Sequence, residues 1–241
     1  MEEYYEIKYH ELEEKGWWFL GRRDMILRLL KDVAKEARIL DIGCSGGVVL
    51  LDLKRHGFTN IYGIDTSNRA IERCRTRGIQ NVFVADGRRT SFEDNFFDVV
   101  IASDTLEHIE GEREAMREWL RILKPGGRAI VFVPAHMFLW SGHDVANKHV
   151  KRYSKKEFRR VLSESGFEIE RLGYWNFMLF FPAFLSRYFI LHKDGGDQLY
   201  SASEFVNGLL LSLLRFENFL LALGIRFPIG VSLFCVARKP L

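Results

Sequence analysis

The sequence predicts an α/β domain with a parallel sheet and helices on both of its faces. Between residue 38 and about residue 173, short runs rich in β-branched residues alternate with amphipathic helical stretches, which is the pattern of a parallel sheet built from crossover units. The chain has 241 residues, 47% of them apolar, enough for the core of one domain of ordinary size.

The alternation assigns a range to each element of this core, which we place at residues 37–174. Strands are expected at residues 38–42, 60–64, 81–85, 98–102, 128–133 and 167–174, and helices at 46–56, 67–77, 110–122 and 155–165. The run Lys124-Pro125-Gly126-Gly127 is a strong stop signal between the third helix and the strand that follows it.

Three segments flank this core. Residues 1–36 are expected to form a helical cover that carries the aromatic patch Trp17-Trp18-Phe19. Residues 175–228 are very apolar and predict a helical insertion that serves as a lid or an interface. Its two apolar runs are too short or too interrupted for a confident membrane span, which needs ~18 or more apolar residues. Residues 229–241 contain one last strand of the core sheet.

The composition argues against several classes of protein. With 35 basic and 32 acidic residues, the net charge of +3 is too small to predict a nucleic-acid partner. Cys44, Cys74 and Cys235 are too few and too scattered for a disulfide framework or a zinc site. The acidic N-terminus lacks the apolar core of a signal peptide. We therefore expect a cytoplasmic protein, with peripheral membrane contact as an alternative.

The run from Ile39 to Gly47 is the most informative part of the chain, because an apolar strand passes there through a glycine-rich turn into a helix. Such a turn brings a ligand close to backbone N–H groups and to the positive end of the helix. The dinucleotide pattern G-x-G-x-x-G is not met, since Ser45 and Val48 stand at its second and third glycine positions. Asp41 would repel a pyrophosphate but attract a cationic amino group.

From this turn through the next hundred residues, the chain resembles the class I S-adenosylmethionine-dependent methyltransferases. It is similar to bacterial and archaeal members of undefined acceptor and, more distantly, to ubiquinone-pathway O-methyltransferases. The resemblance implies S-adenosylmethionine as cofactor and a Rossmann-like sheet whose final strand is antiparallel. Further motifs that carry it are Tyr62-Gly63-Ile64-Asp65, Ala85-Asp86-Gly87, Phe97-Asp98 through Ser103, Leu106-Glu107-His108-Ile109 and Leu123-Lys124-Pro125-Gly126-Gly127.

The resemblance also implies where the cofactor binds. Asp65 would hydrogen-bond the ribose hydroxyls, and Asp86 would accept a hydrogen bond from the adenine amine. Arg22 or Arg23, after the aromatic patch, could pair with the methionine carboxylate; the alternative is that these arginines lie in solvent. The expected cofactor-binding residues are Asp41, Gly43, Cys44, Ser45, Gly46, Asp65, Thr66, Asp86, Gly87, Ser103, His108 and Arg22.

The long loop after the fifth strand carries the candidate catalytic residues His143 and His149. Methyl transfer to a hydroxyl requires the loss of a proton, and a neutral imidazole is the commonest general base. The alternative is that these histidines only fix the loop through hydrogen bonds. Some relatives hold magnesium with an E-x-x-E-H arrangement. Whether the corresponding Asp104, Glu107 and His108 hold a metal is left open.

The expected function is methyl transfer from S-adenosylmethionine to a small or lipid- or glycan-linked acceptor, at oxygen. One alternative is a non-catalytic S-adenosylmethionine-binding partner protein. Another is an RNA methyltransferase, but Ser103-Asp104-Thr105-Leu106 stands where an N-P-P-Y-type tetrapeptide is expected, and we expect no nucleic-acid partner. The insertion should roof the acceptor site and favour an apolar or lipid-linked acceptor; the alternatives are a homodimer interface, membrane contact or burial against the domain itself.

Overall fold

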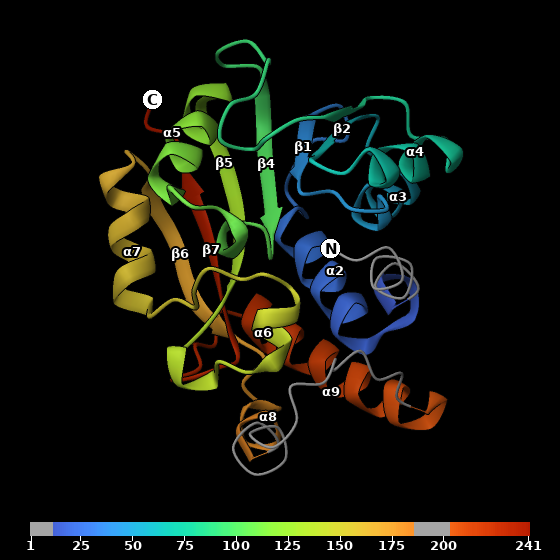
Figure 1. Ribbon diagram of the computed structural model, residues 1–241, viewed down its shortest axis with the longest axis vertical. Coiled ribbons are helices and arrows are strands. Elements are labelled where there is room, and N and C mark those ends of the chain that lie inside the picture. The colour runs from blue at the N-terminus through green and yellow to red at the C-terminus, as the bar shows by residue number, and fades with distance from the viewer. Residues whose placement is uncertain (1–11, 186–202) are drawn as a thin grey trace.

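The computed structural model describes residues 12–185 and 203–241 and contains a seven-stranded sheet with helices on both faces (Figure 1). The strand order is β3-β2-β1-β4-β5-β7-β6. The strands are β1 (Arg38–Ile42), β2 (Asn60–Asp65), β3 (Val82–Val84), β4 (Phe97–Ser103), β5 (Leu123–Pro134), β6 (Glu168–Trp175) and β7 (Ser232–Arg238).

The first five strands are parallel, and β7 runs antiparallel between β5 and β6. Cys235 of β7 lies opposite Val131 of β5 on one side and opposite Leu172 of β6 on the other. Since β6 is antiparallel to β7, it runs in the direction of the first five strands. The expected Rossmann-like sheet with an antiparallel final strand is therefore confirmed.

The helices lie close to their expected ranges. One face of the sheet carries α5 (Glu112–Ile122) and α7 (Lys155–Glu164), and the other carries α2 (Trp17–Leu29), α3 (Val48–Arg55) and α4 (Asn68–Thr76). The remaining helices are η1 (Leu106–His108), η2 (Met137–Leu139), α6 (Gly142–Ala146), α8 (Phe180–Leu185) and α9 (Glu204–Ala222). Ser67 and Ser154 begin α4 and α7 by accepting a hydrogen bond from the backbone three residues later.

The core follows the two-residue period of the strands. In β4, Val100 and Ala102 pack with the α5 and α7 side, whereas Val99 and Ile101 pack with the α2, α3 and α4 side. All four side chains are buried. When a parallel sheet is covered on both faces, the sequence of each strand is a nearly continuous apolar run. The strands were therefore recognisable from the sequence.

Residues Lys124–Gly127 were expected to separate the third helix from the next strand, but in the structure they lie within strand β5. Strand β5 begins at once after α5, at Leu123, which pairs with Phe97. The next pairing joins Arg128 to Val99, so the four residues between Leu123 and Arg128 bulge out of the ladder. The glycines are compatible with this bulge, since Gly126 has φ of 75°.

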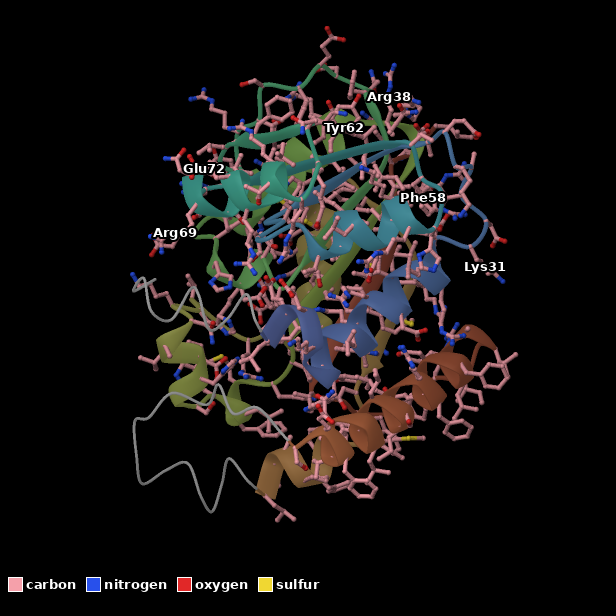
Figure 2. All side chains as sticks on the ribbon, turned by 90° about the vertical axis from the view of Figure 1, so that its right-hand side faces the viewer. Lys31, Arg38, Phe58, Tyr62, Arg69 and Glu72 are labelled. Atoms are coloured by element: carbon pink, nitrogen blue, oxygen red, sulfur yellow. The ribbon has the colours of Figure 1, made fainter. Side chains whose placement is uncertain are left out.

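Helix α9 of the apolar insertion packs against α2 (Figure 2). The contact is close because a Cβ on Gly21 would lie 2.3 Å from Leu214 Cδ2. Asn218 donates from Nδ2 to the Gly21 carbonyl at 2.8 Å and accepts from Trp175 Nε1 at 2.8 Å. The N-terminal cover and the insertion are thus joined to each other and to the end of β6.

Candidate functional site

A cavity of about 830 Å³ lies over the carboxyl ends of β1, β2 and β4. Open α/β sheets bind their ligands at this edge, where the loops after neighbouring strands meet. Residues of the loop after α6, among them Asn147 and Lys148, close one side of the cavity. The expected cofactor-binding residues that line it are Gly43, Ser45, Asp65, Thr66, Asp86, Gly87 and His108.

The glycine-rich turn approaches the neighbouring strand end closely. Gly43 has φ of 72°, and a Cβ there would lie 2.5 Å from Thr105 Oγ1. Only glycine fits this combination of conformation and space. The Thr105 hydroxyl donates to the Ile42 carbonyl at 2.8 Å, so the turn after β1 is tied to the residue that follows β4.

Asp65, at the end of β2, lines the cavity with a carboxylate that is held in place by backbone hydrogen bonds. Its two carboxylate oxygens accept hydrogen bonds from the backbone N–H groups of Ser45 and Ser67, both at 2.9 Å. These bonds fix the carboxylate between the first two strand ends, with one side facing the cavity. A fixed carboxylate at this place can accept from the hydroxyls of a ribose, as predicted.

The cavity wall continues to Asp86 and Gly87 after β3. The Arg88 side chain and backbone N–H bind the Asp86 carboxylate at 2.6 to 3.1 Å. The Arg88 hydrogen bonds hold the pKa of Asp86 below its usual value despite the opposing effect of burial. Gly87 is packed against Ile42, and its carbonyl accepts from Trp119 Nε1 at 2.8 Å. These contacts fix the wall near the expected adenine.

Three carboxylates gather beneath the glycine-rich turn. Asp41 is 2% exposed, and burial, followed by the nearby charges of Glu13 and Asp65, raises its pKa well above the usual value. The Glu13 carboxylate accepts a hydrogen bond from Ser45 Oγ at 2.8 Å. A cationic group would relieve the repulsion among these acids. The N-terminal segment therefore reaches the glycine-rich turn through Glu13.

The two arginines of the N-terminal segment separate. Arg22 is buried and forms an ion pair with Asp104, which lines the cavity after β4. Arg23 instead binds Asp52 of α3 at 2.8 Å and the Glu13 carbonyl at 2.9 Å. Of the two, only Arg22 lies beside the cavity, in contact with one of its lining residues.

Three other expected cofactor residues lie behind the cavity surface. The Cys44 thiol is buried, and its backbone N–H donates to the Ile64 carbonyl at 3.0 Å. The Gly46 carbonyl accepts from Arg77 at 2.7 Å. The Ser103 hydroxyl is buried and has no hydrogen-bond partner among the described residues. Cys44 and Gly46 therefore shape the turn, and none of the three lines the described cavity.

The candidate bases occupy different positions in the loop after β5. His149 Nδ1 lies 2.8 Å from Asp144 Oδ1, and its ring meets that of His108 edge-on at 4.7 Å. The His143 ring lies beside the Asn147 amide, and its centre is 6.1 Å from the centre of the His149 ring. Neither ring lines the cavity, but His149 is one contact away from it through His108.

Asp144 is the centre of a buried network that the sequence did not reveal. It is fully buried and accepts from Arg152 Nε at 2.8 Å, from Arg152 Nη2 at 3.0 Å and from the Ser141 backbone at 2.9 Å. The hydrogen bonds and charges of His149 and Arg152 outweigh burial and hold the pKa of Asp144 well below its usual range. Arg152 belongs to a stretch rich in basic residues, from Lys151 to Arg160, whose polar sequence favours a solvent-exposed surface and gives no sign that Arg152 is buried.

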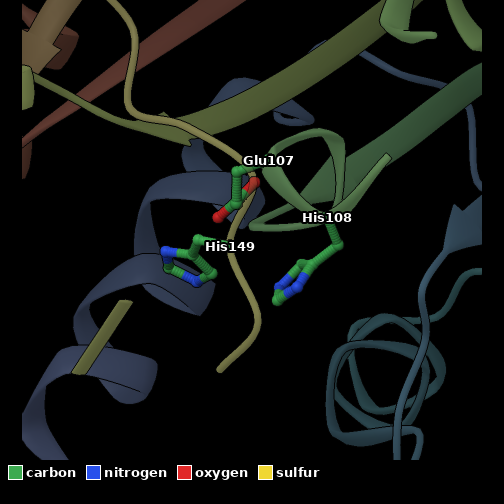
Figure 3. A group of neighbouring side chains, drawn as sticks. All are labelled: Glu107, His108 and His149. Atoms are coloured by element: carbon green, nitrogen blue, oxygen red, sulfur yellow. The ribbon is translucent and has the colours of Figure 1, made fainter. Parts of the chain in front are cut away.

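Glu107, His108 and His149 form a compact donor group (Figure 3). Their potential ligand atoms all lie within 4.8 Å of one another. Glu107 is 1% exposed, and within the described chain neither of its carboxylate oxygens has a hydrogen-bond partner. Asp104 is not part of this group and pairs with Arg22. A carboxylate and two imidazoles fit a divalent transition metal, and Asp144 is placed to orient His149 from behind.

The family model of a methyltransferase domain matches residues 19–172, which is more than half of the chain. The chain belongs to the S-adenosylmethionine-dependent methyltransferases. Its cofactor is S-adenosylmethionine.

Several curated methyltransferases are similar in sequence. The ubiquinone biosynthesis O-methyltransferase of Rickettsia typhi is 29% identical over 203 residues, 69% of this chain and 80% of that protein. The EEF1A lysine methyltransferase 2 of Danio rerio is 30% identical over 141 residues, 51% of this chain and 60% of that protein. The ubiquinone biosynthesis O-methyltransferase of Hahella chejuensis is 32% identical over 95 residues, 37% of this chain and 40% of that protein. The matched region thus covers less than two thirds of the length of the last two relatives.

Solved structures share the fold of this methyltransferase at lower identity. A methyltransferase solved in complex with the Haloferax volcanii Trm112 activator is 18% identical, with a TM-score of 0.65 over 98% of this chain and 95% of the other. The [4+2]-cyclase SpnF is 22% identical, with a TM-score of 0.60 over 92% and 82%. At this identity the likeness shows the fold alone, and the second example shows that this fold also serves a cyclase.

Proposed function

We propose that this methyltransferase transfers the methyl group of S-adenosylmethionine to a hydroxyl oxygen of a small or lipid- or glycan-linked acceptor. The observation that carries the proposal is the pair His149 and Asp144, joined at 2.8 Å beside the cavity wall. The names of the ubiquinone-pathway relatives agree with transfer to oxygen.

The cavity orients the cofactor in this proposal. Asp65 accepts from the ribose, and the adenine lies toward Asp86 and Gly87. The methionine ammonium lies toward Asp41 and Glu13, where it neutralises buried negative charge. The methionine carboxylate lies toward Arg22, whose present partner Asp104 lines the cavity. The methyl group then faces the loop that carries His149.

The chemistry requires one proton acceptor. The Asp144 carboxylate accepts from Nδ1–H of His149, and this leaves Nε2 to take a proton. As the acceptor oxygen forms its bond to the methyl carbon, the bond from that carbon to sulfur breaks. The hydroxyl proton passes to His149 Nε2, and neutral S-adenosylhomocysteine leaves. Most of the rate comes from holding oxygen, carbon and sulfur in line.

The donor group around Glu107 gives His149 a second candidate role. A divalent cation held by Glu107, His108 and His149 would supply a Lewis acid beside the acceptor site. His149 cannot bind that cation and take the acceptor proton through the same nitrogen. The two roles are therefore alternatives for that nitrogen.

The test uses S-adenosylmethionine labelled in its methyl group. The acceptor panel holds catechols with and without a short isoprenoid chain, total RNA, and lipid and polar extracts of the source cells. We expect label in an alkali-stable methyl ether, with greater turnover on the isoprenoid catechols. His149→Gln should lower turnover by about 100-fold, whereas the matched His143→Gln should change it by less than about threefold.

Other outcomes select the alternatives. Label in RNA would favour an RNA methyltransferase. Tight cofactor binding with no labelled product from any extract would favour a non-catalytic binding protein. Full activity of His149→Gln would remove the proposed base and leave the cofactor assignment intact.

A further inference from the structure

Exposed apolar side chains gather at one end of the molecule. Thirteen of the seventeen large apolar residues that are exposed in the described chain lie on η2, α6, α8, α9 and the turn after α9. Helices α6, α8 and α9 form the lower end in Figure 1, on the carboxyl side of the sheet. The thirteen are Met137, Phe138, Val145, Phe181, Leu185, Phe205, Val206, Leu209, Leu213, Phe216, Phe219, Leu223 and Ile225.

Helix α9 carries the longest part of this surface, which we call the α9 ridge and define as Phe205, Leu209, Leu213, Phe216 and Leu223. The five residues follow helical spacing and are 37 to 80% exposed. Leu214, Glu217, Asn218 and Leu221 are buried on the opposite side of the helix. Because the sequence places apolar residues on most sides of this helix, it favours burial all round, but within the described chain the outer side is uncovered.

The inner side of α9 is tied to the domain by polar contacts. Glu217 accepts from the backbone N–H groups of Phe177 and Met178, both at 3.0 Å, and Asn218 binds α2 and Trp175. Among the described helices, α9 is long and apolar enough to span a membrane, and 22% of its apolar 18-residue window is buried. Because its inner side holds the domain, we place it along a lipid surface with only the outer ridge inserted.

Basic side chains flank the C-terminal end of the ridge. Lys155 and Arg159 of α7, Arg171 of β6 and Arg226 after α9 lie near one another, and Arg171 donates a hydrogen bond to the Leu221 carbonyl at the end of α9. Burial and then the charges of Arg159 and Arg226 lower the pKa of Lys155, and burial and then Arg226 lower that of Arg171. Arg159, Arg226 and also Arg215 of α9 are exposed, whereas Lys155 and Arg171 are half-buried. An apolar ridge beside clustered cations matches the acyl chains and headgroups of an anionic bilayer.

We infer that this end of the molecule docks on the surface of an anionic phospholipid bilayer, with the α9 ridge among the acyl chains and Arg215 and Arg226 at the headgroups. The docking goes beyond the proposed function and does not depend on it. Where the proposed function holds, docking turns the carboxyl edge of the sheet, and with it the cofactor cavity, toward acceptors that reside in the membrane.

Vesicle flotation of the full chain tests this inference. The probes are vesicles of phosphatidylcholine alone and of phosphatidylcholine with phosphatidylglycerol. The ridge variant is Leu209→Glu with Phe216→Glu. The control variant, Gln80→Glu with Ser163→Glu, places two new carboxylates at exposed positions outside the insertion. Calorimetry with S-adenosylhomocysteine shows that each variant is folded.

We expect the wild type and the control to float with the phosphatidylglycerol vesicles. The ridge variant should lose binding by at least about tenfold, because two apolar anchors are replaced by charges. Arg226→Glu should weaken binding only to the anionic vesicles. Equal flotation of the ridge variant and the control would overturn the inference. So would a wild type that ignores vesicles and forms a dimer that the ridge variant disperses, since a second copy would then cover the ridge. Failure to find methyl transfer would leave the flotation result unchanged.

Discussion

Four of the six non-glycine residues that have a positive φ in the described chain lie one to three residues after the carboxyl end of a strand. They are Ser45, Asp104, His136 and Asn176, with φ between 47° and 61°, and they follow β1, β4, β5 and β6. This conformation costs about 1 to 3 kcal/mol per residue and persists where surrounding contacts enforce it. Strain is thus concentrated at the edge of the sheet where the cavity lies, which agrees with a functional edge.

Asp65→Ala should weaken the binding of S-adenosylmethionine by about 1.5 to 3 kcal/mol, because a charged hydrogen-bond acceptor is lost from the ribose site. Titration calorimetry measures this directly. Asp98→Ala is the matched control, since Asp98 begins β4 at the opposite edge and binds Lys124 at 2.6 Å and the Arg38 backbone at 2.8 Å. It should cost stability and leave the affinity unchanged. Equal affinities of wild type and Asp65→Ala would refute the ribose assignment.

Glu107 should make the stability of the methyltransferase depend on pH. Burial raises its pKa to about 8, so the folded protein keeps a proton that the unfolded chain releases near its ordinary value of 4.5. This contribution to stability is complete below that ordinary value and is lost as the pH rises through about 8.

Glu107→Gln should therefore be more stable than the wild type at high pH, by about 1 to 3 kcal/mol, the cost of an unpaired buried charge. Below the ordinary glutamate value this advantage should vanish. Urea unfolding below the ordinary glutamate pKa and again above the raised pKa of Glu107 measures the difference in stability. An equal difference at the two pH values would contradict the raised pKa of Glu107. Stabilisation of the wild type, but not of the variant, by added Mn²⁺ would show that the donor group of Glu107, His108 and His149 holds a cation.

Some site residues could be predicted from the sequence because their position follows from local patterns. Gly43, Asp65 and Asp86 each follow a strand, and parallel strands bring their carboxyl ends to one edge. The roles of Glu13 and Arg152 could not be predicted. Glu13 contacts Ser45, which is 32 residues away in the chain. Arg152 contacts Asp144 only because the irregular loop between them folds back on itself. An isolated charged residue in a polar run gives no local signal of burial.

At the scale of elements, the contact between α2 and α9 joins the N-terminal helix of the described chain to the helix that precedes the last strand. Residues of the predicted N-terminal cover and of the predicted insertion meet here, 190 residues or more apart. Helix propensity identified both helices, but no sequence pattern indicates that Gly21 of one lies on Leu214 of the other. The short helix α6 was also missed, because its five residues lie in a loop with no apolar period.

Gly21→Ala should destabilise the protein by about 1 to 3 kcal/mol, because the new Cβ would lie 2.3 Å from Leu214 Cδ2. Leu214→Ala alone should cost about 2 to 4 kcal/mol, because it empties a buried position. The double variant should cost less than the sum of the two, since the smaller residue makes room for the new methyl group. Urea unfolding of all four proteins measures the coupling. Strict additivity would mean that the helices separate easily here.

At the scale of the whole molecule, the sheet depends on its last strand. β7 pairs with β5 on one side and β6 on the other, and within the described chain β6 pairs with no other strand. The buried side chains of β7 belong to the cores on both faces, with Leu233 on one and Phe234 on the other. The final strand was predictable from its apolar run, and its antiparallel place followed from the family resemblance.

Removal of residues 232–241 should leave a protein without a cooperative unfolding transition and without affinity for S-adenosylmethionine, although no residue near the cavity is removed. Removal of Leu241 alone, which is 95% exposed, is the control and should change neither property. Circular dichroism during thermal unfolding, together with calorimetry, distinguishes the two. A folded, cofactor-binding protein without β7 would show that β1 to β5 form an independent unit.

Because β7 lies between β5 and β6, the sheet cannot be completed until the end of the chain has been synthesised. The five parallel strands leave the ribosome first, and the edge of β5 stays unpaired until residues 232–238 follow. During that interval the nascent chain exposes a strand edge together with the apolar segment that precedes β7, a combination prone to wrong pairing with other chains. We expect the methyltransferase to need chaperone protection during synthesis more than a sheet that is completed in chain order.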